Sequence, residues 1–239
     1  MVLTGVEKKL GDFFLRVEQF NIHESGIYGL VGPNGSGKST LAKLMAGLLE
    51  CDSGNVDPQG LTWRDITLIA RKPYMMDDSV YNNLVYPLKL RKINPDPRLI
   101  ADYLDKMGFS RREKQKARSL SSGEQQKLAL LRALIFKPRL VIADEAMTAL
   151  DIDSLDLFEN MILEEQKKEP VIWIIISHQM PQIRRLANHV FFMHEGKIET
   201  EGATEELFTV NSNPYLKQYL RAYGDGVAGA GKSNETLYR

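Results

Sequence analysis

The sequence has little cysteine, no net charge and no long apolar run, and each absence excludes a class of protein. Cys51 is the single cysteine of 239 residues, so the chain forms no internal disulfide and suits a reducing compartment. The 31 basic and 31 acidic residues cancel, which gives no reason to expect nucleic acid as a partner. The longest strongly apolar run, 171–176, is far shorter than the ~18 residues of a membrane span, and no secretion signal opens the chain. We therefore expect a soluble cytoplasmic protein.

One stretch is rich in glycine instead: residues 32–40 read GPNGSGKST and match the pattern GxxxxGK[ST]. The apolar run 27–31 before it predicts a buried strand, and the helical spacing of Leu41, Leu44 and Leu48 after it predicts a helix. A strand, a glycine loop and a helix in this order form a phosphate-binding P-loop. Its glycines let backbone N–H groups turn inward around a phosphate, and the helix start adds the positive end of a dipole.

We therefore expect a nucleoside triphosphate to bind the residues of this loop, namely Gly32, Pro33, Asn34, Gly35, Ser36, Gly37, Lys38, Ser39 and Thr40. Lys38 is expected to reach the β- and γ-phosphates, and the Ser39 hydroxyl to ligate Mg²⁺. A second match to the pattern, at 226–233, has no apolar strand before it and no helical period after it. We interpret that match as coincidental, within a flexible tail over 224–239.

Apolar patterns in the rest of the chain predict an α/β fold with a doubly wound core, because strands alternate with helices. Continuous apolar runs at 140–143 and 171–176 are typical of strands buried on both faces of a parallel sheet. The alternation within 13–22 predicts a pair of half-buried strands, and 190–199 predicts a closing hairpin. Residues 73–118 are helical in character, with Asp96 as the cap of one helix and a solvated connector over 111–118.

Two carboxylates, Asp144 and Glu145, follow the buried run 140–143. Ligands of open α/β sheets bind at the carboxyl ends of the strands. Asp144 is therefore expected to hold Mg²⁺, directly or through water, and Glu145 to act as a general base toward the attacking water. An Asp-Glu pair after an apolar run is usually only a strand end, and it is the P-loop upstream that favours the catalytic interpretation.

Two further stretches carry polar groups at the ends of predicted elements. Ser121 and Gly123 lie within 120–124, which opens a predicted helix, and a serine there is by default only a cap. A hydroxyl, a glycine amide and a helix dipole also form an anion site when they occur together. His178 follows the strand 171–176, where a lone histidine is more often structural than catalytic.

The order of these motifs closely resembles the nucleotide-binding subunits of ABC transporters, over roughly residues 1–212. The segments that correspond to the Walker A, signature, Walker B, D-loop and switch-histidine motifs are 32–40, 120–124, 140–145, 148–151 and His178. The resemblance implies Mg²⁺-dependent ATP hydrolysis in a head-to-tail dimer of two copies. ATP on the Lys38 loop of one copy would be closed over by Ser121 and Gly123 of the other, and His178 would contact the γ-phosphate.

The resemblance also implies a mainly parallel P-loop NTPase core within one domain over 1–223, with an N-terminal antiparallel β subdomain and a helical subdomain inserted at 73–118. The segment 79–88 is similar to the helical subdomain of importers, where integral-membrane subunits dock. We therefore expect the ATPase subunit of an ABC importer, held at the inner face of the cell membrane. The compact size and Arg71 favour an oxyanion such as molybdate or tungstate as cargo.

Two other classes of protein fit the sequence less well than an importer subunit does. A non-transport ABC ATPase of the DNA-repair or ribosome-associated kind needs a coiled-coil insertion, a basic surface or a second cassette, and the sequence has none of these. A P-loop kinase gives no reason for the sequence LSSGE at 120–124 or for His178.

The chain departs from the family pattern in three places. The signature reads LSSGE instead of LSGGQ, and Arg71 follows the strand 66–70 where the family has a glutamine. Arginine has no acceptor atom for a metal, so Arg71 is either a solvated loop residue or a charge that contacts a phosphate or Glu145. At the position of the usual adenine-stacking aromatic stands Leu10, with Phe13 and Phe14 close by, and both phenylalanines are equally well explained as sheet core.

Overall fold

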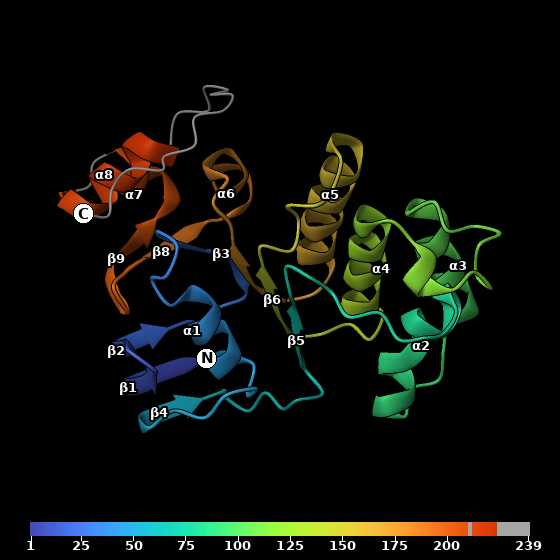
Figure 1. The fold of residues 1–239 in the computed structure, drawn as a ribbon, viewed down its shortest axis with the longest axis horizontal. Coiled ribbons are helices and arrows are strands. Elements are labelled where there is room, and N and C mark those ends of the chain that lie inside the picture. Colours follow the sequence, from blue (N-terminus) through green and yellow to red (C-terminus); the bar gives the residue numbers. More distant parts are fainter. Residues whose placement is uncertain (210–211, 224–239) are drawn as a thin grey trace.

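Two sheets organise the computed structural model, which describes residues 1–209 and 212–223 (Figure 1). The six-stranded sheet has the order β5-β6-β7-β3-β8-β9. Its strands are β3 (Gly26–Val31), β5 (Ile66–Ile69), β6 (Leu140–Asp144), β7 (Ile172–Ile176), β8 (His189–His194) and β9 (Lys197–Ala203). Neighbours from β5 to β8 are parallel, and β9 returns antiparallel to β8. The predictions of a mainly parallel sheet and a closing hairpin are confirmed.

Strand β6 shows why the central strands read as continuous apolar runs. Successive side chains of a strand point to opposite faces of the sheet. Leu140 and Ile142 pack into the core that contains helix α1 (Lys38–Met45), and Val141 and Ala143 pack into the core on the other face. All four side chains are fully buried. That second core is covered by helices α4 (Ser122–Leu134) and α5 (Ile152–Lys168), among others.

The smaller sheet is antiparallel, with β1 (Val2–Leu10) between β2 (Phe13–Asn21) and β4 (Ser53–Asp57). Its apolar face packs with α1 against the larger sheet (Figure 1). The prediction of a pair of strands within 13–22 was wrong, because these residues form the single strand β2, paired with β1. The buried positions change phase between Val17 and Phe20, opposite Gly5 at φ 58°, and the strand continues through that change.

The helical part of the molecule extends beyond α4, away from the antiparallel sheet (Figure 1). It contains α2 (Val80–Arg91), α3 (Pro97–Lys106) and the short 3₁₀ helix η1 (Ala117–Ser119), which ends one residue beyond the predicted range 73–118. The predicted cap of α3 is confirmed, since an Asp96 carboxylate oxygen accepts from the N–H groups of Arg98 and Leu99 at 2.9 and 3.4 Å.

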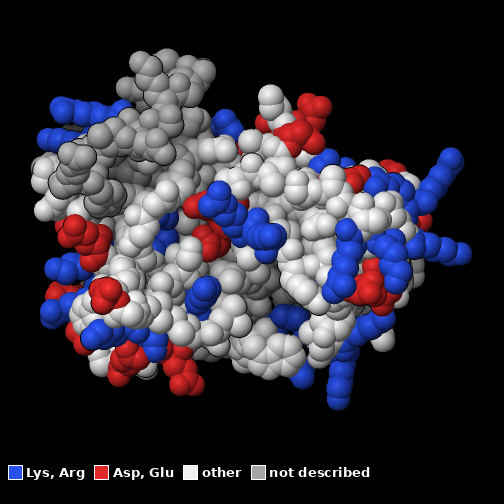
Figure 2. All heavy atoms as spheres, in the orientation of Figure 1, with Lys and Arg blue, Asp and Glu red and all other residues white. Residues whose placement is uncertain are grey.

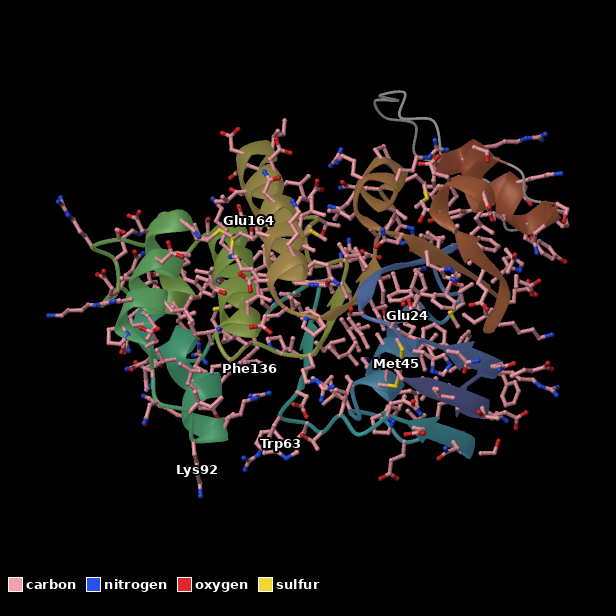
Figure 3. All side chains as sticks on the ribbon, turned by 180° about the vertical axis from the view of Figure 1, so that it is seen from behind. Glu24, Met45, Trp63, Lys92, Phe136 and Glu164 are labelled. Atoms are coloured by element: carbon pink, nitrogen blue, oxygen red, sulfur yellow. The ribbon has the colours of Figure 1, made fainter. Side chains whose placement is uncertain are left out.

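Arg91, at the end of α2, ties this helical part to the sheet. Its guanidinium lies 3.6 Å from the ring centroid of Phe136 and 5.3 Å from that of Trp63, the two aromatic residues labelled in Figure 3. Its Nε also donates to the carbonyl oxygen of Arg64 at 3.0 Å. Because Trp63 precedes β5 and Phe136 follows α4, one arginine joins three segments by cation–π and hydrogen-bond contacts.

The chain closes with α6 (Met180–Leu186), α7 (Thr204–Thr209) and α8 (Pro214–Tyr223). None of the described helices combines the length and the apolar character that crossing a bilayer requires. Basic and acidic side chains are interspersed over the face drawn in Figure 2, and several Lys and Arg side chains project from the helical end. The predicted tail over 224–239 and its second GxxxxGKS match lie outside the described residues.

Candidate functional site

The loop between β3 and α1 wraps around the ammonium group of Lys38. Lys38 Nζ donates to the carbonyl oxygens of Gly32 and Pro33, both at 2.8 Å, and lies 3.4 Å from Ser36 Oγ. The residue is only 6% exposed. Burial lowers the pKa of Lys38 to about 8, although the charges of two nearby carboxylates oppose the shift. A buried cation at the start of a helix favours an anionic ligand beside it.

Glycines give this loop its concave shape. Gly32, Gly35 and Gly37 have φ angles of 150, 79 and 104°, which L-residues rarely adopt. A Cβ on Gly32 would lie 2.0 Å from the carbonyl oxygen of Met193, and one on Gly37 would lie 2.8 Å from the ring of Phe13. The loop borders a cleft of about 340 Å³ lined by Phe13, Asn34, Gly35, Gly37, Lys38, Ser39, Thr40 and Glu145. Backbone amides and a lysine around such a cleft fit a phosphate chain.

The two predicted carboxylates stand at the carboxyl end of β6. Glu145 has φ 49°, a left-handed conformation that costs a non-glycine residue free energy. Its N–H donates to the Ile176 carbonyl oxygen at 3.0 Å, and its own carbonyl accepts from Thr148 Oγ1 at 2.9 Å. Bonds to β7 and to the next turn therefore hold Glu145 in this strained conformation. Asp144 and Glu145 both act electrostatically on Lys38.

His178 and Arg71 meet at the carboxylate of Glu145. His178 Nε2 lies 3.0 Å from Glu145 Oε1, and Arg71 Nη1 lies 3.3 Å from Oε2. The pKa of His178 is lowered, chiefly by burial and further by the Lys38 ammonium, so the imidazole is neutral at pH 7. The sequence predicts that Arg71 is either a solvated loop residue or a charge near a phosphate or Glu145. In the structure it contacts Glu145, although its side chain is 73% exposed.

The segment 120–124 forms the start of α4, and its polar groups pair with one another. The Ser121 hydroxyl accepts from the Glu124 N–H at 3.3 Å, and the Ser121 N–H donates to Glu124 Oε2 at 2.8 Å. Arg112 Nη1 donates to Glu124 Oε1 at 2.6 Å, and this bond together with that from Ser121 lowers the pKa of Glu124 to about 2. The prediction that 111–118 is a solvated connector is therefore wrong for Arg112, whose guanidinium is paired.

Ser121 and Gly123 do not line the cleft beside Lys38. Figure 1 shows α4 and α1 on opposite sides of strands β5 and β6. A Cβ on Gly123 would lie 3.2 Å from the Ala149 carbonyl oxygen, so the segment 148–151 packs against the start of α4. Of the predicted site residues, the chain thus brings together those of the P-loop, Asp144, Glu145 and His178, and leaves the start of α4 apart.

A tyrosine that the sequence did not single out also reaches the site. Tyr219 of α8 places Oη 3.4 Å from His178 Nδ1. Its spacing from Leu216 indicates a buried helix face, and nothing in that pattern indicates which residue it contacts. Among the adenine candidates, Phe13 lines the cleft, whereas Leu10 and Phe14 are 43% and 47% exposed.

The same site residues do not by themselves enclose a metal ion. Within the described residues, no group of three or more His, Cys, Asp or Glu side chains could hold one. A hydroxyl at Ser39 and a carboxylate at Asp144 do fit Mg²⁺ when a phosphate chain supplies further oxygen ligands.

Comparisons with known proteins agree with this geometry. The model of the ABC transporter family matches residues 15–148. The tungstate uptake system ATP-binding protein TupC of Peptoclostridium acidaminophilum is 34% identical over 80% of this chain and 93% of its own length. The phosphate import ATP-binding protein PstB of Saccharolobus solfataricus is 29% identical over 83% and 86%. A solved ATP-binding subunit of an ABC transporter superposes with a TM-score of 0.83 at 19% identity, covering 94% of this chain and 99% of that one.

Proposed function

The chain belongs to the ABC transporter family as the ATP-hydrolysing subunit of an importer, and we propose that its cargo is an oxyanion of the tungstate and molybdate class. The observation that carries the ATPase mechanism is a cleft lined by Lys38 and Glu145, with His178 Nε2 3.0 Å from Glu145 Oε1. The choice of tungstate and molybdate as cargo is supported by the tungstate uptake subunit, which is 34% identical to this chain. The phosphate and methionine import subunits are 29% and 27% identical.

Nucleotide binding is assigned to the P-loop. The loop amides and the helix dipole of α1 would cradle the β- and γ-phosphates, and Lys38 would exchange its bonds to the Gly32 and Pro33 carbonyls for phosphate oxygens. Ser39 and Asp144 would hold Mg²⁺, which when bound neutralises phosphate charge. The ring of Phe13, at the edge of the same cleft, is the contact proposed for the adenine.

Hydrolysis is assigned to Glu145 and His178. The Glu145 carboxylate would take a proton from the water whose oxygen attacks the γ-phosphorus, while the bond from that phosphorus to the β,γ-bridging oxygen breaks. His178, neutral at pH 7, would donate from Nε2 to a γ-phosphate oxygen. Arg71 would hold the other carboxylate oxygen of Glu145 and so orient it, a task that needs a hydrogen-bond donor and no metal ligand.

Ser121 and Gly123 do not line the cleft of their own chain, so a role for them at a nucleotide would need a second copy. We propose a head-to-tail dimer in which they close over the partner's γ-phosphate. In such a dimer the Glu124 carboxylate would also lie near the partner's phosphate and would repel it. The bond from Arg112 to Glu124 supports the proposal because the arginine neutralises this negative charge.

Membrane subunits would dock on the helical part. The segment that follows Arg71 exposes Tyr74, Tyr81 and Tyr86, which are 70%, 38% and 42% accessible. Exposed aromatic residues are typical of protein interfaces. Because Arg71 begins this segment and contacts Glu145, movement at the docking face would reach the carboxylate that activates water.

The decisive experiment replaces Glu145 by Gln in the full-length chain. The amide no longer accepts the proton, so ATP turnover should fall by at least about 100-fold while ATP binding persists. Light scattering should then show an ATP-bound dimer. The matched control is Glu164→Gln, an exposed carboxylate on α5 (Figure 3), which should behave as wild type. A Glu145→Gln protein that turns over ATP at the wild-type rate would refute the mechanism.

The cargo is tested separately in cells that carry this chain. Uptake of tungstate, phosphate and methionine is compared between the wild type and cells that hold only the Glu145→Gln form. Loss of tungstate uptake alone supports the tungstate and molybdate class. Loss of phosphate or methionine uptake with tungstate uptake intact would assign another cargo and leave the ATPase mechanism standing.

A further inference from the structure

Helix α8 returns from the end of the described chain to the catalytic histidine. Its N–H groups are capped by Asn213, whose Oδ1 accepts from the Leu216 N–H at 3.0 Å. Leu216 and Tyr219, on one face of the helix, are 0% and 5% exposed. The Tyr219 hydroxyl lies 3.4 Å from His178 Nδ1. A polar group so deeply buried needs a partner, and the histidine supplies one.

Ring contacts fix α8 in this place. The Tyr219 ring lies 5.5 Å from that of Phe192 on β8, and the Tyr215 ring stacks on His194 at 4.3 Å. The centroid of the Tyr223 ring lies 4.8 Å from that of Tyr219. Tyr215 and Tyr219 thus seat the helix on β8, the strand that neighbours β3 and its P-loop. The Tyr223 ring lies 5.9 Å from that of His178. Packing on the sheet therefore positions the Tyr219 hydroxyl beside the histidine.

The direction of the hydrogen bond follows from the carboxylate beside the other ring nitrogen. His178 is neutral, so one ring nitrogen accepts and the other carries the hydrogen. A carboxylate oxygen accepts hydrogen bonds, so the hydrogen of the His178 ring is placed on Nε2, 3.0 Å from Glu145 Oε1, and Nδ1 is left to accept from the Tyr219 hydroxyl.

We propose that Tyr219 is a positioning residue for ATP hydrolysis: its hydroxyl donates to Nδ1 of His178 and holds the imidazole in the Nε2–H tautomer that faces Glu145 and the γ-phosphate. The inference rests on the role proposed above for His178. It goes beyond that role because it makes the C-terminal helix part of the hydrolysis machinery.

The test is Tyr219→Phe in the full-length chain, because phenylalanine keeps the ring and removes only the hydroxyl. We expect kcat for ATP to fall about 2- to 10-fold, the size of one neutral hydrogen bond, with KM unchanged. Long-range ¹H–¹⁵N spectra of histidine-labelled protein without nucleotide should show His178 as the Nε2–H tautomer in the wild type and as a mixture in the variant. The His178 signals are those lost in His178→Ala.

The control is Tyr215→Phe on the same helix, which keeps the stack on His194. It should leave kcat, KM and the His178 signals as in the wild type. Tyr219→Phe with wild-type kcat, or with an unchanged His178 tautomer, would overturn the inference. A rise in KM at constant kcat would also overturn it, because it would place Tyr219 in nucleotide binding.

Failure of the inference and failure of the ATPase mechanism give different results. If wild type hydrolyses ATP and His178→Ala does not, while Tyr219→Phe equals wild type, only the role of Tyr219 is lost. If His178→Ala hydrolyses ATP normally, the proposed role of His178 is lost, and the positioning role of Tyr219 with it, even where the nucleotide-free spectra show the tautomer shift.

Discussion

The cleft beside Lys38 and the start of α4 both carry residues of the family's motifs, yet their polar groups are arranged in opposite ways. In the cleft, Lys38 is buried, Glu145 is held in a left-handed conformation and His178 has a lowered pKa. At the start of α4, Ser121 and Glu124 form a reciprocal cap. The cleft holds a buried charge and a strained residue, whereas the polar groups at the α4 start satisfy one another. This difference agrees with the proposal that the cleft carries the chemistry, and the role proposed for the α4 start on a second copy needs its own test.

The largest expected effect is on the cleft side of this comparison. Lys38→Ala should weaken ATP binding by at least about 100-fold, because two charge-assisted contacts to phosphate are lost. Isothermal calorimetry measures the affinity. The control is Lys43→Ala, an exposed lysine on the same helix, which should bind ATP as wild type does. Equal affinity for Lys38→Ala and wild type would contradict the P-loop assignment.

The next effect tests whether the α4 start acts on another chain. Ser121→Arg should lower hydrolysis about 100-fold, as for a lost donor to transition-state charge, without changing the affinity of one chain for ATP. A mixture of Ser121→Arg and Lys38→Ala subunits should recover activity, because one of the two sites in the mixed dimer then has both halves intact. Normal turnover by Ser121→Arg alone would exclude the role.

A smaller effect is expected at the edge of the cleft, where Arg71 meets Glu145. Arg71→Ala should lower the steady-state ATPase rate about 3- to 5-fold, since the pair is largely exposed and each such pair contributes little. ADP affinity should change less than the rate. Arg71→Gln, which supplies an acceptor for the metal, should retain substantial activity. The neighbouring exposed Lys72→Ala is the control, and wild-type rates for Arg71→Ala would make Arg71 only a solvated loop residue.

The smallest effect concerns stability at the α4 start. The pKa of Glu124 falls from an ordinary value near 4.5 to about 2, so the carboxylate stabilises the fold above pH ~4.5 and this contribution is lost as pH falls through 2. Glu124→Gln should cost about 1 kcal/mol at pH 7, or a Tm lower by about 2–4 °C, because partial exposure weakens the pair. The difference from wild type should shrink between pH 4 and pH 2 in thermal melts. Glu164→Gln, which removes an exposed carboxylate from α5, is the matched control at pH 7 and should melt as wild type does.

The sequence by itself determined the features that are local along the chain. A P-loop needs glycine at several positions with positive φ, and Gly32, Gly35 and Gly37 occupy such positions within six residues. Buried strands and capped helices are likewise predicted by the spacing of apolar residues and by single capping residues such as Asp96. Strand β2 shows the limit of this reasoning. The alternation of buried and exposed positions shifts opposite Gly5, and in the sequence such a shift within one strand resembles a break between two strands.

Only the tertiary structure decided which distant side chains meet. Parallel pairing of β6 and β7 brings Glu145 to His178, and the loop after β5 brings Arg71 to the same carboxylate. Tyr219 and His178 are 41 residues apart, and α8 joins them because its tyrosines pack on β8. Such contacts depend on the order of the strands in the sheet and on how the helices pack. Neither can be predicted from the spacing of residues within one segment of the sequence.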